Sequence, residues 1–261
     1  MSRLKSAHNG ESHGIITYIM VNTVGSYENK NWQKRWIPIK KNLVVSPVQH
    51  SFIVGSLLGD GTMWLGEGAV NANFKVEQGL VQKDYVFWKY EILKSLVFTE
   101  PKISFRYDNN GRRYPKSWWF RTIRHPLLTE IFRRFYLQSG FRCGRKIVPR
   151  DIENDLSPLA LAVWVMDDGS YSKGKIDIST YSFSLEEVKF LQEIFARKFG
   201  VKMLFFKDRD KGYRMYANVE ETKKLIQTIY PYIIPTMMYK IGFRNPVTTS
   251  RHSSGELSVT G

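Results

Sequence analysis

Two apolar segments of this chain share the same beginning and the same end. They open with Ser46-Pro47 and Ser157-Pro158, and they run until they reach Asp60-Gly61 and Asp168-Gly169. Serine favours the N-cap and proline the first helical turn, while a glycine in a left-handed conformation commonly follows the last helical residue. The pattern therefore predicts two helices that each end at an aspartate, with a left-handed glycine cap behind it.

The pattern that follows each Asp-Gly also occurs twice. A region with turn glycines includes alternating polar and apolar positions, as in 73–77, which favours a half-buried strand. A helix comes next (82–96 and 184–199), then a hairpin that turns at 110–111 or 211–212, and then another helix (127–136 and 220–230). The order α-ββ-α-ββ-α is thus predicted twice, which makes the fold class α+β with two pseudo-symmetric halves.

These repeats also suggest where the chain divides. We expect the first half at residues 46–150 and the second at 151–244. An N-terminal extension, 1–45, precedes them and contains a basic, aromatic segment that could contact nucleic acid or remain solvated. Serine and threonine pairs in residues 245–261 favour a flexible tail.

Composition narrows the class of partner. The 261 residues include 39 basic and 24 acidic side chains, for a net charge of +15. Such an excess favours a polyanion, nucleic acid before an anionic membrane. We expect no membrane partner, because no apolar segment approaches the roughly 20 residues of a spanning helix. The single cysteine, Cys143, excludes a disulfide framework and a cysteine-based zinc site.

The two aspartates admit a structural and a functional interpretation. Asp-Gly is a common turn dipeptide, but a carboxylate at a helix C-terminus costs about 0.3–1 kcal/mol against the helix dipole. If the two helices pack side by side, with Gly55 and Gly59 allowing a close approach, Asp60 and Asp168 meet at one end. Neighbouring carboxylates repel each other unless a cation lies beside them, and oxygen ligands suit Mg²⁺. That arrangement indicates phosphodiester hydrolysis.

A family resemblance adds to this interpretation. Segments 53–61 and 161–169 resemble the two LAGLIDADG motifs of a single-chain, intron-encoded homing endonuclease, and the similarity extends over about 46–243. WVMDDG and IPTMMYK are similar to segments of monomeric members from organelles. The resemblance implies β-saddles that bind DNA and a monomeric, site-specific endonuclease that makes a double-strand break at a long asymmetric site. It further implies intron mobility and an organelle, otherwise a prokaryotic cytoplasm.

The resemblance also implies roles for individual residues. Asp60 and Asp168 would bind the divalent metal, Mg²⁺, for which Mn²⁺ or Ca²⁺ could substitute in binding, with the backbone carbonyls of Gly59 and Asp167 as further ligands. We expect the Asp167 side chain to face solvent or pack between helices, in preference to a place near the metal ligands. Lys146 and Lys240 would be the basic residues that assist catalysis. Gln78 would order water in the active site. For Gln78 the second half offers Thr180 or Tyr181, a poorer match.

DNA contacts are expected on the paired strands, which fit the major groove. The candidates are basic residues of the predicted strands and hairpins: Lys75, Arg106, Arg112, Arg113, Arg121, Lys175, Lys207, Arg209 and Arg214. Two other functions stay open. An intron RNA maturase of the same fold would use intron RNA as its partner and needs no hydrolysis. A non-catalytic DNA-binding protein would bind tightly without Mg²⁺.

Overall fold

The computed structural model describes residues 40–139 and 142–243. Most of the predicted N-terminal extension and the whole predicted tail, 245–261, lie outside these residues. The division into 46–150 and 151–244 stays a prediction. Within the described part of the chain, no helix combines the length and the apolar composition that a membrane crossing requires.

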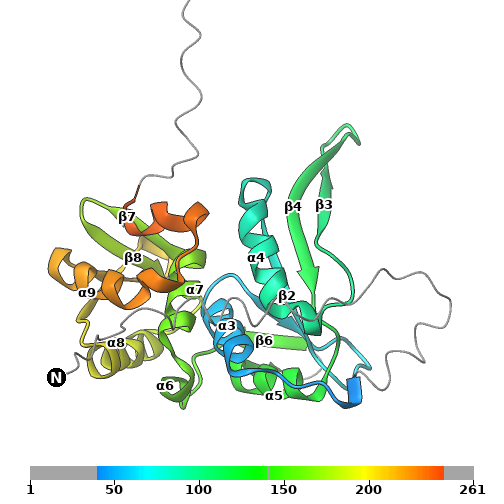
Figure 1. Cartoon of the computed structure of the whole chain (residues 1–261), viewed down its shortest axis with the longest axis horizontal. Helices are drawn as coiled ribbons and strands as arrows, with labels where there is room; N and C mark the ends of the chain where they lie inside the picture. The colour runs from blue at the N-terminus through cyan, green and yellow to red at the C-terminus, as the bar shows by residue number, and fades with distance from the viewer. Residues whose placement is uncertain (1–39, 140–141, 244–261) are drawn as a thin grey trace, which may run out of the picture.

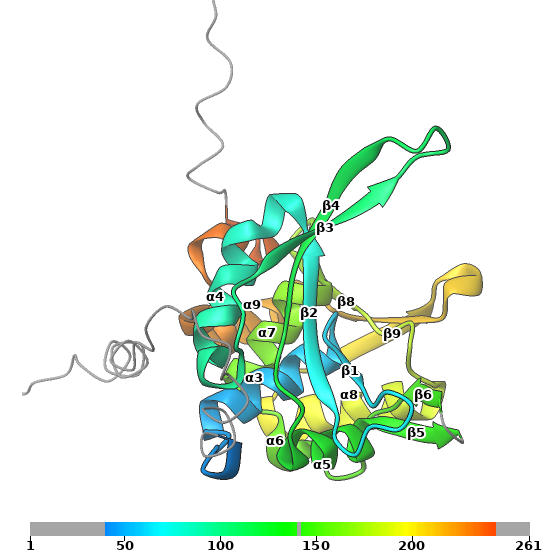
Figure 2. The ribbon, with the colours of Figure 1, turned by 90° about the vertical axis from the view of Figure 1, so that its right-hand side faces the viewer.

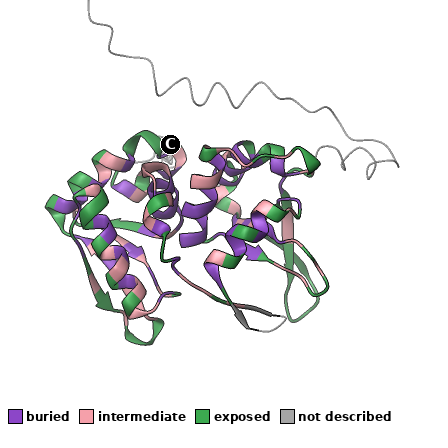
Figure 3. Ribbon diagram, turned by 90° about the horizontal axis from the view of Figure 1, so that it is seen from below, coloured by how far each residue is buried: buried purple, intermediate pink, exposed green. Residues whose placement is uncertain are grey.

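Two helices form the centre of the molecule, α3 (Pro47–Leu58) and α7 (Pro158–Asp168). Ser46 Oγ accepts a hydrogen bond from Gln49 N, and the Gln49 side chain accepts one from Ser46 N, which completes a capping box. Ser157 Oγ accepts from Ala160 N in the same way. Both predicted helix starts are confirmed, and most of each helix beyond its first turn is buried (Figure 3).

The predicted left-handed glycine caps are wrong. Neither Gly61 nor Gly169 has a positive φ, and α7 ends in an extended Gly169 with φ −75°. Glycine is needed here for space instead. A Cβ on Gly61 would lie 2.7 Å from the carbonyl oxygen of Ser56, and one on Gly169 would lie 2.4 Å from that of Val165. The chain therefore leaves each helix by passing close to its last turn.

Each half places a four-stranded antiparallel sheet beside its central helix (Figures 1 and 2). The strand orders β1-β2-β4-β3 and β7-β8-β10-β9 are equivalent, so the predicted duplicated α+β fold is confirmed. The strands of the first sheet are β1 (Thr62–Trp64), β2 (Asn73–Gly79), β3 (Lys102–Tyr107) and β4 (Arg113–Arg121). Those of the second are β7 (Gly169–Ser172), β8 (Lys175–Ser179), β9 (Met203–Lys207) and β10 (Tyr213–Ala217).

The other helices appear where the sequence pattern predicts them. They are α4 (Lys83–Leu93), α5 (Pro126–Phe135), α8 (Leu185–Phe199) and α9 (Val219–Ile229). A short helix, α6 (Ile152–Asp155), precedes α7, and an additional hairpin, β5 (Tyr136–Ser139) with β6 (Arg142–Lys146), precedes α6. Short 3₁₀ segments are η2 (Leu80–Gln82), η3 (Lys94–Leu96), η4 (Arg209–Lys211), η5 (Tyr230–Tyr232) and η6 (Pro235–Ile241).

The β3–β4 hairpin extends beyond the rest of its sheet (Figure 2). Adjacent tryptophans on β4 point to opposite faces, as alternation in a strand requires. Trp118 packs against the core and the ring of Phe87, whereas Trp119 lines a surface groove of about 710 Å³ together with Lys75. One face of the first sheet therefore belongs to the core and the other is open to a partner.

Candidate active site

Glycines on α3 bring the two central helices into unusually close contact. A Cβ on Gly55 would lie 2.2 Å from the carbonyl oxygen of Ala160, and a Cβ on Gly59 would lie 2.6 Å from Cβ of Asp167. Real Cβ atoms do not approach other atoms this closely, so any larger residue would push the helices apart. The predicted role of these two glycines in helix packing agrees with this geometry.

The close approach brings the helix ends, and the two acids on them, into one region. Asp60 is exposed and Asp168 is half-buried. Burial, followed by the negative charges of Asp60 and Asp167, raises the pKa of Asp168 to about 7. Gly59 lies against Asp167, and Gln78 donates to both Asp60 and Asp167, so Asp60 and Asp168, 108 positions apart in sequence, lie in the same region, as the side-by-side arrangement predicts.

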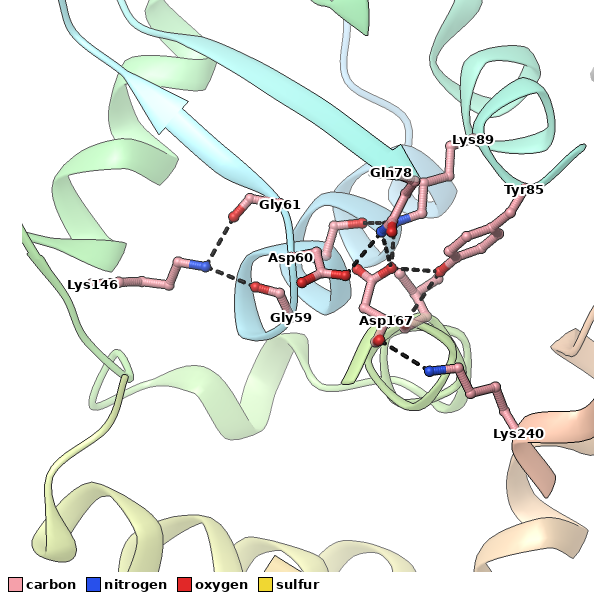
Figure 4. Close-up of polar contacts among 11 residues, drawn as sticks. Gly59, Asp60, Gly61, Gln78, Tyr85, Lys89, Lys146, Asp167 and Lys240 are labelled. Carbon is pink, nitrogen blue, oxygen red and sulfur yellow. Dashed lines mark hydrogen bonds and ion pairs between the residues drawn. The ribbon is translucent and has the colours of Figure 1, made fainter. Parts of the chain in front are cut away.

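Two lysines bind equivalent carbonyl groups in the two halves, approaching from opposite sides (Figure 4). Lys146 Nζ donates to the carbonyl oxygens of Gly59 and Gly61 at 2.8 and 2.9 Å. Lys240 Nζ donates to those of Asp167 and Gly169 at 3.3 and 2.8 Å. Burial lowers the pKa of each ammonium, and the neighbouring carboxylates oppose that shift. The repeat thus extends to atomic contacts around each acid.

Gln78 connects the two motifs. Its Nε2 donates to Asp60 Oδ2 at 3.0 Å and to Asp167 Oδ1 at 3.2 Å (Figure 4). Both partners are carboxylate oxygens, which only accept when ionised, so the amide nitrogen must face them. Gln78 therefore lies beside the acid of its own half and also beside the second motif.

The Asp167 side chain lies between the helices, one of the two positions expected for it. It does not face solvent: the side chain is 0% exposed and its Oδ1 accepts hydrogen bonds from Lys89 Nζ at 2.6 Å and Tyr85 OH at 2.8 Å. Since Gly59 has no side chain, α3 leaves room for this carboxylate between the helices. A buried charge requires partners, which the first half supplies.

Lys89 and Tyr85 are site residues that sequence reasoning missed. Tyr85, Trp88, Ile92 and Leu96 recur at helical spacing and form an apolar stripe, and all of them pack into the core or against it. Lys89 follows Tyr85 by four residues, so it lies on the same helix face. A lysine in register with a buried stripe was the signal that could have indicated an internal charge pair.

The second half has no counterpart of Gln78. Thr180 Oγ1 donates to the backbone carbonyl oxygen of Tyr213 at 2.6 Å, and the Tyr181 hydroxyl donates to Asp208 on the β9–β10 hairpin. Among the residues that the structure describes, no side chain donates a hydrogen bond to the carboxylate of Asp168. The poorer match seen in sequence corresponds to a real difference between the halves.

The donor set suits a hard divalent cation. The acids Asp60 and Asp168 and the carbonyls of Gly59 and Asp167 supply only oxygen, which Mg²⁺ prefers. Within the described residues, no three His, Cys, Asp or Glu side chains converge on a ligand site, so phosphate or water oxygens would have to complete the shell. Burial, followed by the charges of Asp60 and Asp167, raises the pKa of Asp168, and a bound cation would oppose that shift by favouring the ionised carboxylate.

The nine predicted DNA-contacting residues all lie on the two sheets or their turns. Seven of them are exposed: Arg106, Arg112, Arg113, Arg121, Lys175, Lys207 and Arg209. The other two are half-buried in ion pairs, Lys75 with Glu77 at 2.6 Å and Arg214 with Asp177. Each pair joins residues on one sheet face, so it fixes the direction in which the cation points.

Comparison with known proteins agrees with this geometry. Residues 50–225 match the model of the LAGLIDADG DNA endonuclease family. The chain belongs to that family. It is similar to the cytochrome b mRNA maturase bI2 of Debaryomyces hansenii, with 32% identity over 72% of this chain and 71% of the relative. It is also similar to the DNA endonuclease I-ChuI of Chlamydomonas applanata, with 28% identity over 76% of this chain and 95% of the relative.

A solved structure supports the LAGLIDADG fold. The homing endonuclease I-WcaI, determined with its DNA recognition sequence, superimposes with a TM-score of 0.71 over 85% of this chain and 96% of its own. The identity of 22% limits this likeness to the fold. The matched range, 50–225, includes both 53–61 and 161–169, the segments that resemble LAGLIDADG motifs. The roles of individual residues still rest on their geometry.

Proposed function

We propose that this LAGLIDADG protein is a site-specific DNA endonuclease that hydrolyses one phosphodiester bond in each strand and so promotes intron mobility. The observation that supports it most is the meeting of Asp60 and Asp168 at the ends of two helices in glycine contact. Nothing in a helix pair requires two repelling acids there, so a ligand is the simplest reason for them. Both halves lie in one chain, which supports a monomer.

The residues around the acids would divide the work. Asp60 and Asp168 would hold a divalent metal, for which Mg²⁺ is the proposal, with the Gly59 and Asp167 carbonyls beside them. When bound, the metal supplies charge stabilisation at the scissile phosphate and activation of water. Lys146 and Lys240 would stabilise phosphate charge from the two sides of the site. Gln78 would orient Asp60 and a water near it.

Exposed basic residues of the two sheets would bind the duplex. Arginine can contact guanine through two hydrogen bonds in the major groove, whereas most basic contacts go to phosphate. The ion pairs of Lys75 and Arg214 support their participation, because they hold the cations in fixed positions before DNA arrives. The names of the relatives, cytochrome b mRNA maturase and intron-encoded endonuclease, support an organelle as the compartment.

A cleavage experiment tests this function. A plasmid library with a randomised segment is incubated with the protein and Mg²⁺, and the cut ends are sequenced. We expect one long asymmetric site. Asp60→Asn and Asp168→Asn should bind that site as the wild type does and leave it intact, while Glu193→Gln, at an exposed acid of α8, should cut normally. Undiminished cleavage by both aspartate variants would refute the assignment of the acids.

The relatives favour one alternative function. Two of them are named maturases of the cytochrome b mRNA, so this chain could assist the splicing of an intron RNA. Splicing that is unaffected by Asp60→Asn and Asp168→Asn, together with no DNA cleavage by the wild type, would support the maturase. Loss of DNA cleavage in the variants, with or without a splicing effect, supports the nuclease.

A further inference from the structure

A buried polar chain connects helix α4 of the first half to Asp60 through the second motif. Lys89 is 1% exposed, and its ammonium lies 2.6 Å from Asp167 Oδ1 and over the ring of Tyr85, 4.4 Å from the centroid. The same Oδ1 accepts from Tyr85 and from Gln78, and Gln78 in turn donates to Asp60. Three hydrogen bonds in series, from Lys89 to Asp167, from Gln78 to Asp167 and from Gln78 to Asp60, thus join an internal cation to an acid of the candidate site.

This chain of contacts exists in one half only. The position that corresponds to Asp167 in the first motif is Gly59, which has no side chain to take part. The position that corresponds to Gln78 in the second half offers Thr180 and Tyr181, whose hydroxyl groups are bonded elsewhere. Asp60 therefore has a fixed hydrogen-bond partner and, within the described residues, Asp168 has none.

The hydrogen bonds to the Asp167 carboxylate are concentrated on one of its oxygens, which indicates that Lys89 and Tyr85 orient this carboxylate. Asp167 Oδ1 receives three donors, whereas its Oδ2 is buried without a partner in the described residues. Lys89 and Tyr85 hold the carboxylate in one rotamer, with Oδ1 facing Gln78. Without them, nothing in these contacts would direct Oδ1 toward the amide, and Gln78 would lose one of its two acceptors.

We propose that Lys89 and Tyr85 are positioning residues that act through Asp167 and Gln78 on Asp60, and that they favour cleavage of one DNA strand over the other. The inference rests on the endonuclease function proposed above. The bias arises because the polar chain supports Asp60 alone. Neither residue reaches the scissile phosphate in this role, so each influences the reaction only by orienting a group that does.

Strand-resolved kinetics test the inference. The duplex selected from the plasmid library carries a different label on each strand, and both cleavage rates are measured in single turnover with Mg²⁺. Gln78→Ala shows which of the two strand-cleavage rates falls more when Asp60 loses its hydrogen bond from Gln78, and this defines the reference direction for a change in the ratio of the rates. Lys89→Met should change the ratio of the two rates in that direction by about tenfold, the usual scale for groups that orient a metal ligand. Tyr85→Phe should change it in the same direction and less.

Two further variants separate positioning from folding. Lys89→Met combined with Gln78→Ala should give the ratio of Gln78→Ala alone, because Lys89 acts through Gln78. Lys94→Met removes an exposed lysine just beyond the end of α4, paired with Glu91, and should keep the wild-type ratio. If Lys89→Met does not fold, Tyr85→Phe decides, since it removes one hydroxyl and keeps the ion pair.

The outcomes are distinguishable. Variants that slow both strands equally, or that bias the strand opposite to that of Gln78→Ala, would overturn the inference while the wild type's cleavage upholds the proposed function. A wild type that cuts no member of the library would overturn both. A shared bias in Lys89→Met, Tyr85→Phe and Gln78→Ala, absent from Lys94→Met, would establish the positioning role.

Discussion

Gly55→Ala perturbs the contact on which the whole site depends. The added Cβ would lie 2.2 Å from the carbonyl oxygen of Ala160, where ordinary contacts begin at 3.4 Å, so the helices must separate by about 1 Å. Because the obstacle is backbone, no side-chain rotation relieves it. We therefore expect loss of stability together with displacement of Asp60 relative to Asp168.

The magnitude follows from two opposing terms. Overpacking of a buried contact costs about 1–3 kcal/mol, and the upper end applies here because backbone must move. Alanine is about 1 kcal/mol better than glycine inside a helix, which offsets part of that cost. The net loss is about 2 kcal/mol, and it corresponds to a fall in Tm of about 4–8 °C for a chain of this size.

Thermal unfolding and cleavage together check the expectation. Gly79→Ala is the matched control, because a Cβ there meets only the far end of Gln82, 4.0 Å away, and its φ of −56° suits alanine. We expect Gly79→Ala to melt within about 2 °C of the wild type. Gly55→Ala should melt lower and cut more slowly at a temperature where it remains folded. A wild-type Tm with wild-type cleavage would refute the packing argument.

Three other predictions concern the site and the sheets. Lys146→Met and Lys240→Met should each slow single-turnover cleavage about 100-fold with little change in DNA affinity, measured by gel shift. Burial raises the pKa of Glu77, but hydrogen bonds from Lys75, Ser117 and Lys116 outweigh it and lower the pKa to about 2. The ionised Glu77 carboxylate therefore stabilises the folded state fully above pH 4.5, and this stabilisation is lost as the pH falls toward 2. The free energy of unfolding in urea should depend less on pH in that window for Glu77→Gln than for the wild type. Arg106→Ala should reduce the slope of log K against log salt by about 0.9 if Arg106 contacts a phosphate.

The repeated pattern was sufficient for the fold because each element carries a local signal. Ser-Pro starts, the capping box of α8 and the hairpin turns at Gly111 and Gly212 depend on neighbouring residues only. Duplication then fixed the topology, since each half repeats the same order of elements. The conformation of Gly61 and Gly169 was mispredicted because a glycine that provides space cannot be told from one that adopts a positive φ by sequence alone.

The buried network could not be predicted in the same way. Lys89 looks like any lysine of a basic chain until its partner is known, and Asp167 is 78 positions away in the other half. Only the close approach of α3 and α7 brings the two together. Sequence periodicity places a residue on a helix face, but it does not say which face of another helix lies opposite.

The two motifs therefore share one arrangement around each acid and differ in the space between the helices. Lysine binds the carbonyl before each acid in both halves, so that contact repeats with the chain duplication. At the helix contact, symmetry would place two glycines or two aspartates opposite each other. Two glycines would leave a gap, and two aspartates would clash at a Cβ distance of 2.6 Å. Gly59 opposite Asp167 fills the space without a clash. This pair makes the centre of the molecule asymmetric, which is compatible with recognition of an asymmetric DNA site.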